Sequence, residues 1–210
     1  SPGNPTGRVL ALEDIEIILE AATGSVVVVD EAYIDFAPGG GAPDSKASAA
    51  SLFRSGKYPN LIVMQTLSKA WGLAGARLGM AFMPEPMIDV FAKVKAPFNV
   101  SALTEDVVLR SLARPDLVDA RVTTILAERE RVAAALKALH PKILAVHASE
   151  ANFLLFRVPG AKALCEALAR ESGVVVRDRG SMLHCEDCVR VTVGTEAEND
   201  RFLQALSKAL

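Results

Sequence analysis

Residues 61–83 read LIVMQTLSKAWGLAGARLGMAFM. Apolar residues dominate Leu61–Gln65 and Leu78–Met83, so both segments are predicted to be buried strands. Between them lies a loop of small and hydroxyl-bearing residues that contains Lys69. An earlier β-branched run, Ser25–Val29, predicts a strand that is buried on both faces of a parallel sheet. Because helical patterns alternate with these strands, we expect an α/β sheet that binds its ligands at the strand ends.

The pattern changes in the second half of the sequence. Ser101–Leu112 and Pro115–Leu139 have helical periodicity, and the second of these is long and rich in Arg, Glu and Ala. Further strands are predicted at Ile143–Val146, Ala151–Phe156, Val174–Val176 and Val189–Val193, and further helices at Leu12–Ala22, Ala161–Ser172 and Glu196–Leu210. We therefore expect part of a mixed, mostly parallel α/β sheet in residues 1–114, a bridging helix at 115–140, and a smaller α+β domain at 141–210 with one sheet face covered.

The composition excludes several classes of protein. The 210 residues carry a net charge of −2 and half of them are hydrophobic, which argues against nucleic acid or an anionic membrane surface as a partner. Purely apolar runs, such as Val26–Val29, are far too short to cross a bilayer. No signal peptide or lipidation motif is recognisable, so we expect a cytoplasmic protein.

The three cysteines are an odd number, which argues against a disulfide framework. His184-Cys185-Glu186-Asp187-Cys188 contains a C-x-x-C pair beside a histidine. A zinc site needs a second pair of ligands, and neither Cys165 nor the remaining histidines supply one at a matching spacing. We therefore expect no metal site and interpret this segment as a surface loop.

Lys69 is the first candidate catalytic residue. A lysine that is buried or partly desolvated loses proton affinity and becomes a good nucleophile and Schiff-base former. Most lysines are instead solvated on the surface, and the Ser68-Lys69 pair alone does not decide between the two.

Asp30 and Tyr33 are the next candidates. Asp30 ends a predicted buried strand, where a carboxylate needs a cation or hydrogen-bond donors. A protonated pyridine nitrogen would satisfy this need and would make the ring an electron sink. Tyr33, three residues on, could bind a phenolic oxygen of the same ring. The alternatives are a carboxylate that caps the next helix and an ordinary half-buried aromatic residue.

Thr66, Ser68 and Arg77 form a candidate phosphate site. Their hydroxyls and guanidinium donate hydrogen bonds, and those from the guanidinium are charge-assisted. Nearby glycines allow close approach of the backbone. A glycine-rich loop near an arginine is a weak signal by itself, and it gains weight because Lys69 lies inside it.

Taken together, five motifs resemble those of a known family. They are SPGNPTG at 1–7, VVVVDEAYIDF at 26–36, QTLSKAWGLAGARLG at 65–79, ANFLLF at 151–156 and VRVTVGTEAEND at 189–200. In this order they resemble the motifs of the fold-type I aminotransferases that depend on pyridoxal 5'-phosphate, and among these most of all the histidinol-phosphate aminotransferases. The resemblance runs along the whole chain. It is highly specific for the superfamily and less specific for the substrate.

The resemblance implies a role for each candidate around the cofactor ring. Lys69 would form the Schiff base with pyridoxal 5'-phosphate and then move the proton between the substrate and the cofactor. Asp30 would pair with the ring nitrogen. Tyr33 and Asn4 would hydrogen-bond the phenolic oxygen.

The same resemblance assigns the anion sites. Ser68 and Arg77, with Thr66, would hold the cofactor phosphate. In the second domain, Arg190 would grip the carboxylate of the amino-acid donor, and Arg177 would reach a substrate anion. The implied reaction transfers the amino group of histidinol phosphate to 2-oxoglutarate, in histidine biosynthesis and in a homodimer.

The chain begins within the Asn4-Pro5-Thr6-Gly7 loop, whereas members of the family carry a long upstream region with further cofactor and substrate contacts. We therefore expect a C-terminal portion of an aminotransferase, with weak or no cofactor binding by the isolated chain. Part of the sheet would be missing, and its edge would be exposed.

Two other classes of function stay open. The nearest is another enzyme of the superfamily, such as a threonine-phosphate decarboxylase or an aromatic or aspartate aminotransferase. The other is a non-catalytic protein, either a pseudoenzyme fragment or an aminotransferase-like sensor domain fused to a DNA-binding module.

Overall fold

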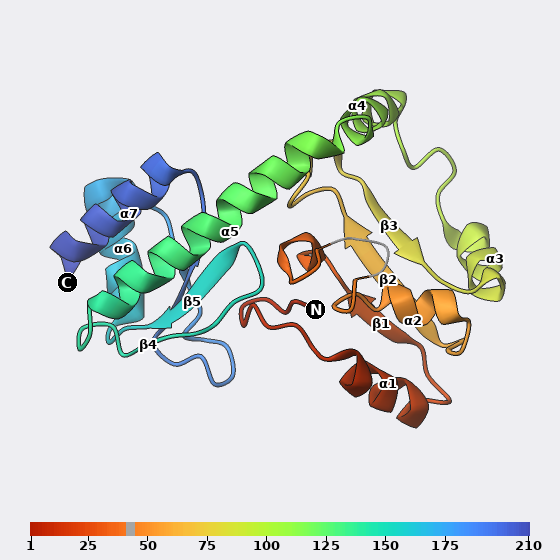
Figure 1. Ribbon diagram of the computed structural model, residues 1–210, viewed down its shortest axis with the longest axis horizontal. Helices are drawn as coiled ribbons and strands as arrows, with labels where there is room; N and C mark the ends of the chain where they lie inside the picture. Colours follow the sequence, from red (N-terminus) through yellow and green to blue (C-terminus); the bar gives the residue numbers. More distant parts are fainter. Residues whose placement is uncertain (41–44) are drawn as a thin grey trace. The chain divides into compact units, whose positions relative to one another are not determined.

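A computed structural model describes residues 1–40 and 45–210 of the chain. The chain divides into two compact units, shown in Figure 1. The first unit comprises Ser1–Pro2 and Val9–Val122, and the second comprises Gly3–Arg8 and Thr123–Leu210. The division falls inside the long helix α5, Pro115–Ala138, which contributes residues to both units.

The sheet of the first unit has three strands in the order β1-β2-β3: β1 is Val27–Asp30, β2 is Leu61–Thr66 and β3 is Gly79–Phe82. The pair β1–β2 is parallel, whereas β2–β3 is antiparallel. In this register Asp30 lies opposite Met64, and Thr66 lies opposite Gly79. The ends of β1 and β2 and the beginning of β3 therefore meet at one edge of the sheet.

Helices cover one face of this sheet. Val29 and Val63 point to the core between the sheet and the helices α1 (Leu12–Ala21) and α2 (Ala50–Ser55). On the other face, the side chain of Val28 is 51% exposed. The prediction of a strand buried on both faces is therefore wrong for β1 among the described residues, because only the side that carries Val29 is covered.

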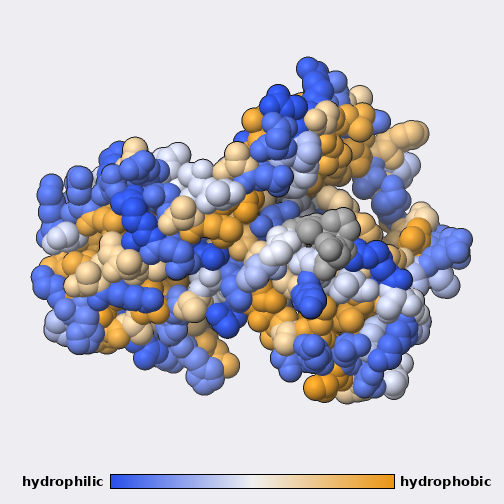
Figure 2. Space-filling view, viewed as in Figure 1, coloured by the Kyte–Doolittle hydropathy of each residue, from blue (hydrophilic) through white to orange (hydrophobic). Residues whose placement is uncertain are grey.

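The first unit contains further helical elements. They are helix α3 (Glu85–Val94), helix α4 (Ala102–Leu112) and the beginning of α5, together with the 3-10 turns η1 (Ile34–Phe36) before β2 and η2 (Ala74–Ala76) before β3. Figure 2 shows hydrophobic colour at the surface near α4, where Leu103 and Leu109 are exposed. None of the helices in the described residues has the length and apolar composition that a membrane span requires.

The second unit contains an antiparallel sheet in the order β4-β5-β7-β6. Its strands are β4 (Ala145–Val146), β5 (Phe153–Arg157), β6 (Arg177–Asp178) and β7 (Cys188–Thr192). Helices α6 (Ala161–Ser172) and α7 (Glu196–Ala209) pack with the rest of α5 against one face of this sheet. Phe156 and Phe202 meet in this core with their ring centroids 6.4 Å apart. The predicted sheet with one face covered by helices is confirmed.

Most predicted elements are confirmed within a few residues, but one strand is wrong. Val174–Val176 is not a strand, and the strand instead occupies Arg177–Asp178. Gly173 ends α6 in the left-handed conformation, and the N–H of Val174 then donates to the carbonyl of Leu168. Because this bond turns the chain back onto the end of α6, residues 174–176 do not pair with β7, and the pairing begins at Arg177. The helices α2 and α3 were not predicted.

Candidate active site

The shared strand edge of the first unit carries an acidic residue at the end of β1. Asp30 is exposed, and its Oδ1 accepts the N–H of Ala32 at 3.0 Å. A shallow hollow of about 400 Å³ opens beside it. The hollow is lined by Asp30, Ala32, Met64, Gln65, Thr66, Gly79, Met80 and Ala81. Asp30 and Thr66, which were both predicted to be site residues, therefore border one hollow.

Lys69 lies in the loop that leaves β2. The loop is closed by a backbone bond from the N–H of Leu67 to the carbonyl of Leu78, at 3.3 Å. The Nζ atom of Lys69 lies 5.3 Å from the centroid of the Tyr33 ring, a favourable cation–π distance. Two predicted site residues are thus brought together. Of the two environments that the sequence leaves open for Lys69, the described residues of the first unit leave its side chain exposed.

The predicted phosphate site gathers around the same loop. The Oγ1 of Thr66 lies 2.9 Å from the Oγ of Ser68 and accepts its backbone N–H. Arg77 has a left-handed backbone conformation, with φ of 57°, and its guanidinium donates to the carbonyl of Ala74. A Cβ atom at Gly79 would stand 3.3 Å from the carbonyl oxygen of Gln65, so glycine allows the strands to approach closely here.

Arg190 and Arg177 lie in the second unit. They are directly opposite each other on β7 and β6. The guanidinium of Arg190 donates to the Oδ1 of Asn4 at 2.9 Å and lies 5.1 Å from the ring centroid of Phe153. Three predicted site residues, Asn4, Arg177 and Arg190, therefore lie in the second unit. The other six predicted site residues lie in the first unit. The roles assigned to all nine stay predictions.

Known proteins are similar to this chain in sequence. The family model for class I and II aminotransferases matches residues 1–206. The chain belongs to the class I and II aminotransferase family. It is 43% identical over 206 residues to a histidinol-phosphate aminotransferase of Cytophaga hutchinsonii, a match that covers 98% of this chain and 56% of that protein. The corresponding enzyme of Saccharomyces cerevisiae is 40% identical and is matched over 54% of its length. The chain thus spans about half the length of the curated relatives it matches.

Solved aminotransferase structures share the fold. The histidinol-phosphate aminotransferase of Sinorhizobium meliloti in complex with pyridoxal 5'-phosphate matches all of this chain and 55% of its own, with a TM-score of 0.86 and 27% identity. A decarboxylase from Sulfurospirillum multivorans matches with a TM-score of 0.83 and 30% identity over 54% of its own chain. These likenesses confirm the predicted α/β fold of the pyridoxal-phosphate-dependent aminotransferases.

This member of the family also has a buried acid that sequence reasoning missed. Glu31 is 1% exposed and directly follows Asp30. Its carboxylate accepts hydrogen bonds from the hydroxyl of Ser48 at 2.8 Å, the N–H of Ala49 at 2.6 Å and the amide of Gln65 at 2.9 Å. Glu31 therefore ties the end of β1 to the start of α2 and to β2. The Asp-Glu pair in the sequence does not show which acid points inward.

A second missed residue supports the lysine loop from α5. Arg121 donates through Nη1 to the carbonyl of Ala70 at 3.2 Å. Gly72 has φ of 69°, and a Cβ atom there would stand 3.2 Å from the same Nη1. Glycine at this position therefore provides both the left-handed turn and the room for the arginine. Nothing local in the sequence connects Arg121 to a loop fifty residues earlier.

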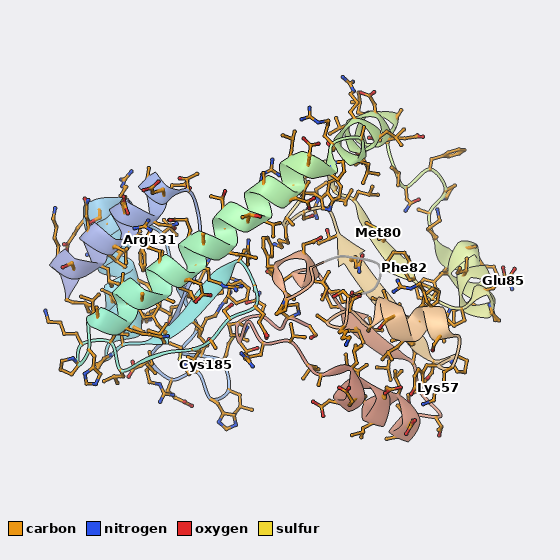
Figure 3. The ribbon with its side chains drawn as sticks, viewed as in Figure 1. Lys57, Met80, Phe82, Glu85, Arg131 and Cys185 are labelled. Carbon is orange, nitrogen blue, oxygen red and sulfur yellow. The ribbon has the colours of Figure 1, made fainter. Side chains whose placement is uncertain are left out.

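The cysteines of this family member lie in the second unit. Cys185 and Cys188 are buried against Leu155, and Figure 3 labels Cys185 in the loop before β7. Burial raises the pKa of the Cys188 thiol, while the guanidinium of Arg157 opposes this effect. Burial also raises the pKa of Cys165 to about 11. Among the described residues, no group of three or more potential ligands is placed to hold a metal ion.

Proposed function

We propose that this chain is the lysine-bearing part of a pyridoxal 5'-phosphate-dependent aminotransferase. The reaction would transfer the amino group of histidinol phosphate to 2-oxoglutarate, a step of histidine biosynthesis. The observation that carries the proposal is the strand edge of the first unit, which presents the Asp30 carboxylate, the Lys69 amine over Tyr33, and the Arg77 guanidinium. The names of the relatives at about 40% identity support the choice of substrate.

The donor set at this edge fits the chemistry of the cofactor. A pyridinium nitrogen needs an anion, and Asp30 supplies one at the end of β1. A phosphate needs cations and hydroxyls, and Arg77, Thr66 and Ser68 supply them within one loop. The hollow beside Asp30 is bordered by Gly79, whose missing side chain leaves room.

Each residue would have a defined task in the reaction. The bound cofactor would supply the electron sink that stabilises charge at the substrate Cα. Lys69 would take the proton from that carbon as a general base and would then deliver it, as a general acid, to the C4′ carbon of the cofactor. Asp30 would hold the ring nitrogen protonated, and Tyr33 would donate to the phenolic oxygen.

The second unit would bind the substrates by their anions. Arg190 would bind the carboxylate of glutamate or 2-oxoglutarate, and its contacts with Asn4 and Phe153 fix the guanidinium in place. Arg177 would bind the phosphate of histidinol phosphate. The two arginines would thus serve the two halves of the reaction. A homodimer, which the family resemblance implies, and the cytoplasmic location expected from the sequence also belong to this proposal.

Reduction with borohydride tests the central assignment. Pyridoxal 5'-phosphate is added to the protein, the mixture is reduced, and the peptides are mapped by mass spectrometry. We expect the pyridoxyl group on Lys69 and none in Lys69→Ala. Lys57→Ala is the matched control, because Lys57 is an exposed lysine that pairs with Glu16 and Glu20. Labelling that persists in Lys69→Ala would contradict the assignment. A stable yellow complex at one cofactor per chain would contradict the expected weak binding.

A decarboxylase is the second candidate, because the decarboxylase of Sulfurospirillum multivorans shares the fold at 30% identity. Product analysis separates the two functions. Glutamate formed from histidinol phosphate and 2-oxoglutarate supports the aminotransferase. Carbon dioxide released from threonine phosphate, without formation of glutamate, supports the decarboxylase.

A further inference from the structure

Arg179 lies on the same side of the second sheet as Arg177 and Arg190. Arg177 is opposite Arg190 in the β6–β7 register, and the N–H of Arg179 continues this ladder by donating to the carbonyl of Cys188 at 2.8 Å. Side chains two residues apart on a strand share a face. Arg179 therefore stands next to Arg177, about 7 Å along the strand. This is the face opposite the helices, because the alternate residues Val189 and Val191 enter the core.

Among the described residues, no carboxylate neutralises Arg177 or Arg179. Within the described part of the second unit, neither guanidinium lies within 4.0 Å of an acidic side chain. The Nε atom of Arg179 is shielded from solvent and has no hydrogen-bond partner among the described residues. A shielded donor without an acceptor is costly, so the position favours a ligand that accepts hydrogen bonds.

The acids that lie close in sequence are engaged elsewhere. Asp178 accepts the N–H of Gly180 at 2.8 Å, and Asp187 accepts the N–H of Gly160 at 3.2 Å. Glu186 lies 3.7 Å from the guanidinium of Arg157. Among the described residues, the charges of Arg177 and Arg179 are therefore left for an anion from outside the unit.

Like charges that lie directly opposite each other across two strands destabilise a sheet. Arg177 and Arg190 are such a pair, and Arg179 adds a third cation one step along. Arg190 already donates to Asn4 and lies over Phe153. Arg177 on β6 and Arg179 directly after it are thus available to bind one doubly charged anion. A phosphate dianion can accept hydrogen bonds from both guanidinium groups.

We propose that Arg179 is a second contact, beside Arg177, for the phosphate group of the amine substrate. This inference rests on the proposed function for the identity of the substrate, but not for the anion site itself. Arg179 distinguishes a phosphorylated amine from glutamate, whose carboxylate is served by Arg190. The site accordingly binds inorganic phosphate in the absence of any other ligand.

The experiment compares three single variants of the full chain. Arg179→Met keeps most of the apolar stem and removes the charge, and Arg179→Lys keeps the charge without the fork. Arg170→Met is the matched control, because Arg170 is an exposed arginine at the end of α6, on the helical side of the sheet. Thermal melting establishes that each variant is folded, and Arg179→Gln replaces Arg179→Met if that variant is unfolded.

Titration calorimetry with inorganic phosphate gives the first measurement. Loss of a charge-assisted hydrogen bond weakens binding about 10- to 100-fold, and this is the change expected for Arg179→Met. Arg179→Lys should recover part of the affinity, and Arg170→Met should bind as the unaltered chain does. Unchanged binding by Arg179→Met, or an equal loss in Arg170→Met, would overturn the proposal.

Kinetics of the active enzyme give the second measurement. In Arg179→Met, kcat/KM for the phosphorylated amine should fall by the same factor, while the half-reaction with glutamate should stay within about twofold. An equal loss for both substrates would assign Arg179 a structural role and overturn the proposal. If the enzyme does not accept histidinol phosphate at all, the proposed function fails, and the phosphate titration still decides the role of Arg179.

Discussion

The two sheets of this protein differ in what lies on the face away from their helices. In the second unit, α5, α6 and α7 cover one face, and the other carries arginines beside the small buried cluster of Leu155, Cys185 and Cys188. In the first unit, α1 and α2 cover one face, whereas the other exposes the apolar side chains of Val28 and Met64. The charged face suits water and anions, while the apolar face suits contact with further protein. The comparison indicates that the hydrophobic core of the second unit is more complete than that of the first unit.

The largest expected effect is in that core. Phe156 is fully buried and contacts Phe202, so Phe156→Ala should lower the free energy of unfolding by about 3–5 kcal/mol. Urea denaturation followed by circular dichroism measures it. Val175→Ala is the control, since Val175 is 73% exposed and should change stability by less than about 0.5 kcal/mol. Equal losses in the two variants would contradict the assignment of the core.

In the first unit, the buried carboxylate of Glu31 provides a comparable test. Glu31→Gln replaces an acceptor oxygen by a donor amide that faces the Ser48 hydroxyl, the Ala49 N–H and the Gln65 amide. We expect a loss of about 1–3 kcal/mol of stability from the unsatisfied donors, measured by urea denaturation. The exposed Glu13 on α1 is the control, and Glu13→Gln should have little effect. A neutral Glu31→Gln would mean that the carboxylate does not organise the end of β1.

The two faces of the first sheet can be compared with one substitution. Val63→Thr places a hydroxyl in the core and should cost about 1–3 kcal/mol, because Val63 is fully buried. Val28→Thr makes the same change on the exposed face and should cost less than about 0.5 kcal/mol. Thermal melting of both variants measures the difference. A similar cost at both positions would show that the apolar face is covered in solution.

The smallest effect concerns acid stability of the second unit. Hydrogen bonds from Arg131, and then from Asn199, lower the pKa of Glu128. Because the folded pKa lies below the unfolded value, this stabilisation is complete above the unfolded pKa of 4.5 and is lost as the pH falls through the folded pKa. The pair contributes at most about 1 kcal/mol.

Urea denaturation at pH 7 and at pH 3 measures this contribution. Glu128→Gln should lose stability at pH 7 and show a weaker dependence on acid. The neighbouring Glu130→Gln should behave as the unaltered chain, because the Glu130 side chain is 75% exposed. An acid dependence that is identical in both variants would remove Glu128 as its source.

The sequence predicted those parts of the site that arise from local pattern. Thr66, Ser68, Lys69 and Arg77 lie within one loop between two strands, so an apolar run followed by a glycine-rich turn was enough to locate them. Asp30 was located in the same way, by the end of a β-branched run. The roles of these residues stay predictions.

Contacts between distant parts of the chain could not be predicted. Arg121 reaches Ala70 from a helix that the pattern describes only as long and charged. Glu31 is buried by groups at the start of α2 and on β2, and the residues beside it in the sequence do not indicate this burial. The valines at 174–176 have high strand propensity. They do not form a strand, because Gly173 is left-handed and the N–H of Val174 donates back to the carbonyl of Leu168 in α6.

The protected thiols make this protein convenient for spectroscopic labelling. Maleimide dyes react with thiolates, and the raised pKa values of Cys165 and Cys188 leave few of them at neutral pH. Cys185 is buried as well. A cysteine introduced at the exposed positions of Val94 in the first unit and Val175 in the second should therefore take up dye selectively. Energy transfer between a donor and an acceptor at these two positions would measure the distance between the units, with and without cofactor.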